Sequence, residues 1–131
     1  MCIIKVNELK NQKDTKNMRN ALFGKEYSAD IGHLLENIVF LELRRRNYHI
    51  WIGKADALEV DFVVRDEKGY TKYIQVAYTV KEEKTLEREL APFMKISDFN
   101  ERLLLTMDHE IHTHNGIKQL NVIDWLLDNI D

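Results

Sequence analysis

The sequence predicts an α/β fold in which a mixed central sheet is flanked by helices. Three observations support this prediction: an apolar helix pattern, then three strand patterns in succession, then a charged helix followed by a strongly apolar strand. The chain has 131 residues, of which 44% are hydrophobic and 31% are charged, a balance typical of one compact domain. The predicted order of elements is α-β-β-β-α-β, followed by a small β-α unit.

The first helix is expected to run from Ser28 or Asp30, either of which can serve as its N-cap, to about Arg46. Its end carries the basic run 44–46, and cations suit the carbonyl end of a helix dipole. Apolar residues surround most of the helix, which indicates that it is buried. They are Ile31, Leu34, Leu35, Ile38, Val39, Phe40 and Leu41.

Three strands are expected next, at residues 48–52, 58–65 and 71–80. The first is aromatic and β-branched, and Gly53 closes it. The second and third alternate between apolar and polar residues, so each presents an apolar stripe on one face. The stripes are Leu58, Val60, Phe62 and Val64 in the second strand, and Ile74, Val76, Tyr78 and Val80 in the third.

A three-residue loop at 67–69, with Gly69 in the left-handed conformation, fits the turn between the second and third strands. This loop would place Asp61 opposite Gln75 and Glu59 opposite Ala77, all on the side away from the apolar stripe. A carboxylate beside a carboxamide oxygen can form a pair of ligands for Mg²⁺ or Mn²⁺. The alternative interpretation is a solvated polar face.

The remaining elements are a helix from about Glu82 to Ile96, interrupted near Pro92, and a strand at 102–106 that is covered on both faces. A short strand at 117–120 and a helix at 122–127 complete the chain.

Two glutamates lie at the apolar surface of the first helix, where an unpaired carboxylate is costly. Glu36 lies at its flank, so we expect a cation, a capping donor or a metal as its partner. Glu42 lies nearer the middle of the apolar face, and there an ion pair or a hydrogen bond to the backbone is the favoured interpretation.

These motifs resemble a known superfamily. A helix with one Glu, an Asp on the second hairpin strand, and an acid or amide followed two residues later by Lys form the signature of the PD-(D/E)xK nuclease-like proteins. More narrowly, four segments are similar to the C-terminal domain of unknown function of archaeal and bacterial AAA-type ATPases. They are GHLLENIVFLELRRR (32–46), EVDFV (59–63), YIQVAY (73–78) and KTLEREL (84–90). The resemblance covers about residues 18–107.

The resemblance implies a restriction-endonuclease-like core with a metal-binding and catalytic triad at Glu36, Asp61 and Gln75. The sequence departs from the signature at Ala77, where the catalytic Lys is expected, and at Gln75, where an acid is more usual. Lys54 or Lys72 could replace that lysine, although Lys72 lies on the opposite strand face.

The resemblance, with its departures, implies a degenerate, non-catalytic accessory or interaction domain that binds nucleic acid or protein. The alternative is a DNA endonuclease or exonuclease that uses Mg²⁺ or Mn²⁺. Arg88, Lys54 and Glu59 are candidate binding residues in either case, since a cation such as Arg88 can neutralise a phosphate.

Composition narrows the remaining function classes. With 19 Lys and Arg against 22 Asp and Glu, the net charge is −3, which argues against a dedicated nucleic-acid binder. No phosphate-binding loop, signal peptide or membrane span is recognisable, so we expect a cytoplasmic protein with no membrane partner. DNA, an AAA-type ATPase or another protein, and a second copy of the chain remain candidate partners.

The expected domain organisation is a poorly defined arm at 1–16 and a single domain at 17–131. The single cysteine, Cys2, excludes an internal disulfide. A zinc site at His109, His112 and His114 is the less favoured interpretation, because their spacing lacks the regularity of paired ligands.

Overall fold

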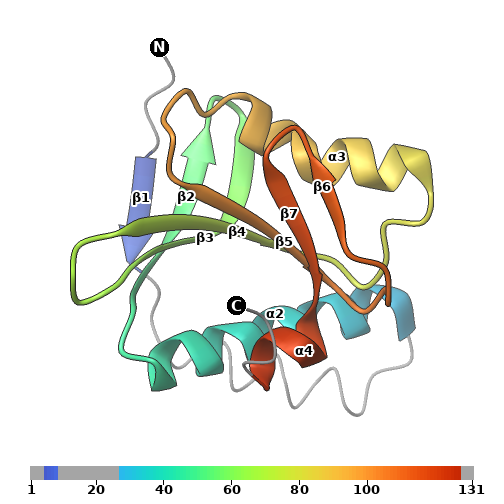
Figure 1. Cartoon of the computed structure of the whole chain (residues 1–131), viewed down its shortest axis with the longest axis horizontal. Coiled ribbons are helices and arrows are strands. Elements are labelled where there is room, and N and C mark those ends of the chain that lie inside the picture. The colour runs from blue at the N-terminus through green and yellow to red at the C-terminus, as the bar shows by residue number, and fades with distance from the viewer. Residues whose placement is uncertain (1–4, 9–26, 128–131) are drawn as a thin grey trace.

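The structure, a computed structural model, describes residues 5–8 and 27–127. A seven-stranded mixed sheet has helices on both faces, with α2 and α4 on one side and α3 on the other (Figure 1). The predicted α/β class is therefore confirmed. The elements are β1 (Lys5–Glu8), α2 (Tyr27–Arg45), β2 (His49–Ala55), β3 (Leu58–Arg65), β4 (Thr71–Val76), α3 (Glu83–Met94), β5 (Glu101–Thr106), β6 (His112–His114), β7 (Ile117–Asn121) and α4 (Val122–Leu126).

The strands lie in the order β1-β2-β3-β4-β5-β7-β6. The pairs β1-β2, β2-β3 and β3-β4 are antiparallel. The pairs β4-β5 and β5-β7 are parallel, and β6 is antiparallel to β7. The expected arm at 1–16 includes β1, which pairs with β2 from Lys5 opposite Lys54 to Glu8 opposite Trp51. No helix in the described ranges is long and apolar enough to cross a membrane.

The core has two halves, one on each face of the sheet. On the α2 face, Val39 and Leu43 pack with Phe62 and Leu105. On the α3 face, Phe93 packs with a second group, Val63, Tyr73 and Leu104. Strand β5 supplies both halves, because its consecutive residues Leu104 and Leu105 are both fully buried on opposite faces. The prediction that this strand is covered on both sides is confirmed.

Helix α2 buries one face only, with Val39 and Leu43 inside and Leu41 48% exposed, so the prediction that it is buried on most sides is wrong. Its start also differs from the prediction. The helix begins at Tyr27, so Ser28 and Asp30 lie inside it and neither is its N-cap. At the other end, the Tyr48 N–H donates to the Leu43 carbonyl (3.1 Å), and the Asn47 N–H donates to Arg44 (3.0 Å). With Asn47 at φ 63°, this is a Schellman ending, which turns the chain directly into β2.

The hairpin between β3 and β4 has the predicted loop. The Asp66 N–H donates to the Tyr70 carbonyl (3.0 Å), which encloses residues 67–69, and Gly69 has φ 90°. Glycine adopts this left-handed conformation without steric strain, because it has no Cβ. The register runs as predicted, from Arg65 opposite Thr71 to Phe62 opposite Ile74.

A β-bulge interrupts the predicted alternation of β3. Strand β2 does not close at Gly53 but continues to Ala55, and its register with β3 shifts between Trp51 and Gly53. Asp61 and Phe62 therefore share one partner position, that of Ile52. Beyond the bulge the faces exchange, because one extra residue reverses the side of every later side chain. Val60 accordingly joins the α3 half of the core, so the predicted stripe of residues 58–64 is wrong at Val60.

Strand β4 is shorter than predicted, because it ends at Val76. The Ala77 N–H donates to the Leu105 carbonyl (3.0 Å), and Tyr78 is 46% exposed, outside the expected stripe. Pro92 lies inside α3 without interrupting it, in the last turn before Met94. Strand β6 was not predicted, although the turn Asn115-Gly116, with φ of 50° and 84°, is a strong hairpin signal.

Truncation of the shared core strand tests this packing. We expect Leu104→Ala to lower the free energy of unfolding by about 3 kcal/mol, because it leaves a cavity in the α3 half of the core. Leu41→Ala is the matched control, since Leu41 lies on α2 and is 48% exposed. Its effect should stay within about 0.5 kcal/mol. Urea denaturation measures both, and equal losses would contradict the two-sided core.

Candidate functional site

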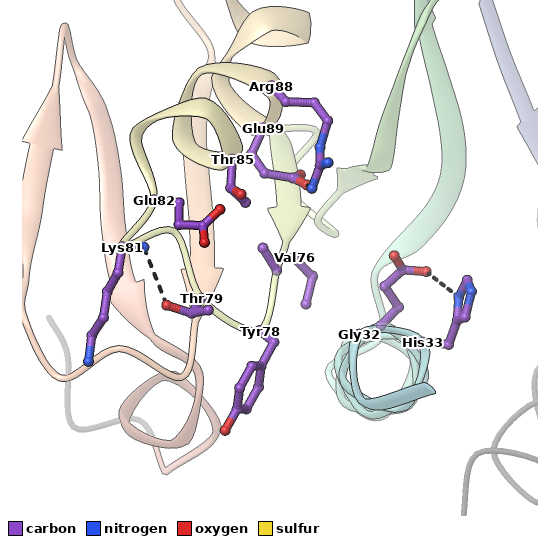
Figure 2. A pocket seen from close by; sticks show the side chains of 12 residues that line it. Gly32, His33, Val76, Tyr78, Thr79, Lys81, Glu82, Thr85, Arg88 and Glu89 are labelled. Carbon is purple, nitrogen blue, oxygen red and sulfur yellow. Dashed lines mark hydrogen bonds and ion pairs between the residues drawn. The ribbon is translucent and has the colours of Figure 1, made fainter. Parts of the chain in front are cut away.

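A cleft of about 760 Å³ opens between the helices at the point where β4 ends. Its walls come from α2 (Gly32, His33 and Glu36) and from the segment 81–89 that includes the start of α3. Residues 76–79, which follow the end of β4, line the cleft between these walls. Figure 2 shows Glu82 and Thr85 facing this space from the second wall. On α2, the His33 imidazole lies beside the Glu36 carboxylate (3.7 Å).

Three side chains join the strands at one edge of the cleft. The Asp61 N–H donates to the Gln75 amide oxygen (2.7 Å), and the Val76 N–H donates to the Asp61 carboxylate (2.9 Å). The Gln75 Nε2 donates to the Glu89 carbonyl (3.2 Å) and lies 3.4 Å from the Glu89 carboxylate. We call Asp61, Gln75 and Glu89 the polar node. It links β3, β4 and α3.

Negative charge accumulates around the polar node. Burial raises the pKa of Asp61 well above its usual value, and the Glu36 carboxylate raises it further. The Val76 N–H opposes this shift, while Glu89 and Glu59 add to it. Burial also raises the pKa of Glu89, although Arg88 (3.6 Å) partly offsets that effect. The node therefore attracts cations or protons.

A smaller hollow of about 140 Å³ lies between α2 and the bulge in β3. Its polar lining residues are Glu36, Asn37, Glu59 and Asp61. Asn37 is only 5% exposed, and its Nδ2 has no hydrogen-bond partner. Because a buried, unpartnered donor is costly, this space suits a water molecule or another small polar group.

The structure brings most of the predicted site residues together. The Gln75 side chain meets the Asp61 backbone as the register predicts, and Glu36 lines both the cleft and the smaller hollow. Asp61 and Glu59 line that hollow on the α2 face together with Phe62, so the prediction that they lie away from the apolar stripe is wrong. Glu59 lines the smaller hollow, and Arg88 lines the cleft.

Two further residues differ from the predicted arrangement. The predicted pairing of Glu59 with Ala77 is wrong, since β4 ends at Val76. Lys54 lies opposite Glu59 on β2 and lines neither space.

Ala77 presents a methyl group to the cleft at the position where the resemblance expects an amine. Lys72, one candidate replacement, lies elsewhere, beside Glu101 (3.5 Å) at the start of β4. The cations that do line the cleft are Arg88 and Lys81.

The other sequence hypotheses have clear outcomes. Glu42 forms the expected ion pair, with Arg45 and Arg46, and their hydrogen bonds lower its pKa to about 2. The His114 Nε2 lies 2.8 Å from the Gln119 amide oxygen. In the part of the chain that the structure describes, no three His, Cys, Asp or Glu residues are grouped to hold a metal ion, so the histidines form no zinc site there.

Sequence reasoning missed two residues of the site, Glu89 and Asn37. Glu89 follows Arg88 in a charged helix, so its sequence context is that of a solvated face. A partial signal was present, because Thr85, Arg88 and Glu89 are spaced to share one side of a helix.

Comparisons with known proteins identify relatives but no activity. The chain is 36% identical over 111 residues to an uncharacterized protein of Haemophilus influenzae, covering 84% of this chain and 26% of that protein. It is also 36% identical over 109 residues to the uncharacterized protein MJ1544 of Methanocaldococcus jannaschii, covering 78% and 23%. The chain thus spans about a quarter of the length of these curated relatives. No family model and no solved structure matches it.

The charge balance of the polar node predicts a pH-dependent effect of Asp61→Asn. Because folding raises the pKa of Asp61, the folded state loses stability as pH rises from the unfolded-state pKa to the folded-state pKa. We expect Asp61→Asn to unfold at a higher temperature than wild type at pH 8, and the gain to shrink toward pH 4. Asn can still accept from the Val76 N–H.

The control for this effect is Asp66→Asn, a second carboxylate on the same hairpin that accepts two turn hydrogen bonds. Calorimetric melting curves from pH 4 to 8 distinguish the two variants. A stability difference for Asp61→Asn that does not change with pH would contradict the charge repulsion.

Proposed function

We propose that the chain is a nuclease-like module of a longer cytoplasmic protein, and that it binds a partner without cutting nucleic acid. The order α2-β2-β3-β4-α3-β5, with β5 parallel to β4, is compatible with the restriction-endonuclease-like core that the sequence resembles. Its relatives are about four times as long as the chain, which is compatible with one module among several. The proposal includes kinship with the C-terminal domain of AAA-type ATPases.

One observation carries the non-catalytic assignment: the Gln75 amide is engaged at both ends. Its oxygen accepts from the Asp61 N–H, and its nitrogen donates to Glu89. A metal ligand must direct its oxygen at the ion, whereas this oxygen completes the junction between β3 and β4. Gln75 is therefore held at both ends by its structural role, which argues against a ligand role, and we derive no hydrolytic step. Ala77 supplies no amine to orient a water molecule.

The charges lining the cleft suit a polypeptide better than a phosphate backbone. Acidic and basic groups alternate along its α3 wall, as Lys81 beside Glu82 and Arg88 beside Glu89. A polyanion would meet the carboxylates of Glu36 and Glu89 without a surplus of cations. An interface of mixed sign instead selects a partner with complementary mixed charges. We therefore infer a protein partner, in preference to DNA.

The alternative function, a DNA nuclease dependent on Mg²⁺ or Mn²⁺, has one observation in its favour. Glu36, Glu59 and Asp61 line the smaller hollow, and burial, together with repulsion from the other two carboxylates, raises the pKa of Asp61. Carboxylates are the ligands that Mg²⁺ prefers, but in the described structure these three are not grouped to hold an ion, so metal binding would require them to approach one another. The same hollow contains Asn37, whose Nδ2 could donate to a water molecule.

Metal titration distinguishes the two functions. We expect about 5 mM Mn²⁺ or Mg²⁺ to leave the melting temperature of the wild-type protein unchanged, because a metal ion stabilises the folded state only if it binds to it. Gln75→Glu should lower the melting temperature at pH 8 by adding a third carboxylate to the node. Mn²⁺ should then restore part of that loss, and the further change Asp61→Asn should abolish the restoration.

The contrary result is a wild-type protein that Mn²⁺ stabilises and an Asp61→Asn variant that it does not. Cleavage of single-stranded or double-stranded DNA by the wild type with Mn²⁺ would then establish the nuclease. Fluorescence anisotropy with labelled DNA at two salt concentrations completes the test, since the proposed protein-binding module gives no salt-dependent DNA binding.

A further inference from the structure

Another hollow, separate from the cleft and the smaller hollow, lies at the opposite end of the parallel strands from the cleft. It has a volume of about 550 Å³ and lies where β4, β5 and β7 begin, beside α4 and the last turn of α2. Its apolar lining includes Leu103, Leu120 and Trp125, which belong to the core on the α2 face. None of its lining residues lines the cleft, so the two sites are separate. We call this hollow the basic cavity.

The rim of the basic cavity has a surplus of positive charge. Its lining includes three cationic side chains, those of Arg46, Lys72 and Lys118, and one carboxylate, that of Glu101. Glu101 lies 3.5 Å from the Lys72 Nζ and 3.6 Å from the Lys118 Nζ, so one carboxylate serves two ammonium groups. Burial lowers the pKa of Lys72, but Glu101 and Tyr48 outweigh that effect and the pKa is raised, so this lysine is charged at neutral pH.

Arg46 completes the rim in a fixed position. Its guanidinium lies over the Trp125 ring, 4.5 Å from the centroid, and donates to the Trp125 carbonyl (2.8 Å). It also pairs with Glu42, which in turn pairs with Arg45, so two guanidinium groups share one carboxylate here too. A rigid, cationic group therefore stands directly above an aromatic surface. Because this side chain is already held in place, it loses little conformational entropy when an anion binds beside it.

We propose that the basic cavity binds a small organic anion, with its apolar body against Leu103, Leu120 and Trp125 and its anionic group between Lys72 and Lys118. Ligand pockets in proteins typically combine an apolar surface with a few convergent polar groups at this volume. The anionic group is a carboxylate or a phosphate monoester, since both pair with two ammonium groups. A nucleic acid fits less well, because the whole chain has a net charge of −3 and the Glu101 carboxylate lies between the two lysines of the rim.

A pair of dyes of similar shape tests the proposal. We expect the anionic dye anilinonaphthalene sulfonate to bind the native protein, and the neutral dye phenylnaphthylamine to bind more weakly. Lys118→Gln should weaken the anionic dye about threefold, as expected for loss of one partly exposed ion pair, and leave the neutral dye unchanged. Lys72→Gln should act in the same way. Lys81→Gln, which changes a lysine of the cleft, is the control and should change neither affinity.

Displacement experiments identify the anionic group. Decanoate and phenyl phosphate are each titrated against the bound dye while the indole N–H resonance of Trp125 is followed by NMR. Displacement by either one, with a shift of that resonance, supports the proposal and assigns the carboxylate or the phosphate. If neither compound displaces the dye, the proposal is overturned. Unchanged anionic-dye affinity in Lys118→Gln also overturns it; this side chain is 59% exposed, so its replacement does not endanger folding.

Discussion

The junction between β3 and β4 is the constraint on which the site depends. Backbone pairing of these strands runs only from Arg65 to Phe62, and beyond it two side chains complete the connection. Gln75 accepts from the Asp61 N–H, and Asp61 accepts from the Val76 N–H. Each satisfies a backbone donor that would otherwise be buried without a partner, at a cost of about 1 to 3 kcal/mol. The same Gln75 amide attaches α3 to the sheet, so strand separation and helix position are coupled in one node.

The fold could be predicted from the sequence wherever local patterns decide the structure. The hairpin loop at 67–69 depends on one residue, Gly69, and its register follows from the loop length. Strand β5 is apolar on both faces because both faces are covered, and its sequence is accordingly a continuous apolar run. The bulge at Asp61 could not be predicted in this way, because its residues alternate like those of a regular strand and only the pairing with β2 reveals the extra residue.

The candidate site was only partly predictable, for a different physical reason. The meeting of Asp61 and Gln75 follows from hairpin register, which is local information. The place of Glu89 depends on how α3 crosses the sheet, and nothing in a charged helical segment specifies that crossing. The resemblance to nucleases assigned Gln75 by its position in a motif. Its role as a junction emerges only when the partners of both amide atoms are known, because a motif specifies residue types and not hydrogen-bond directions.

Helix α2 contributes to both the cleft and the basic cavity. Glu36 lies midway along the helix and lines the cleft, and Arg46 follows its last residue, at the basic cavity. The helix dipole favours a cation at Arg46, since the carbonyl end carries partial negative charge, but its effect is confined to the terminal turns and does not reach Glu36. The positive charge of the basic cavity thus agrees with the electrostatics of the helix end beside it, whereas the mixed charge of the cleft comes largely from α3 and the segment before it. Because the two sites share no lining residue, a protein partner in the cleft and an anion in the basic cavity can bind one small domain without competing for the same side chains.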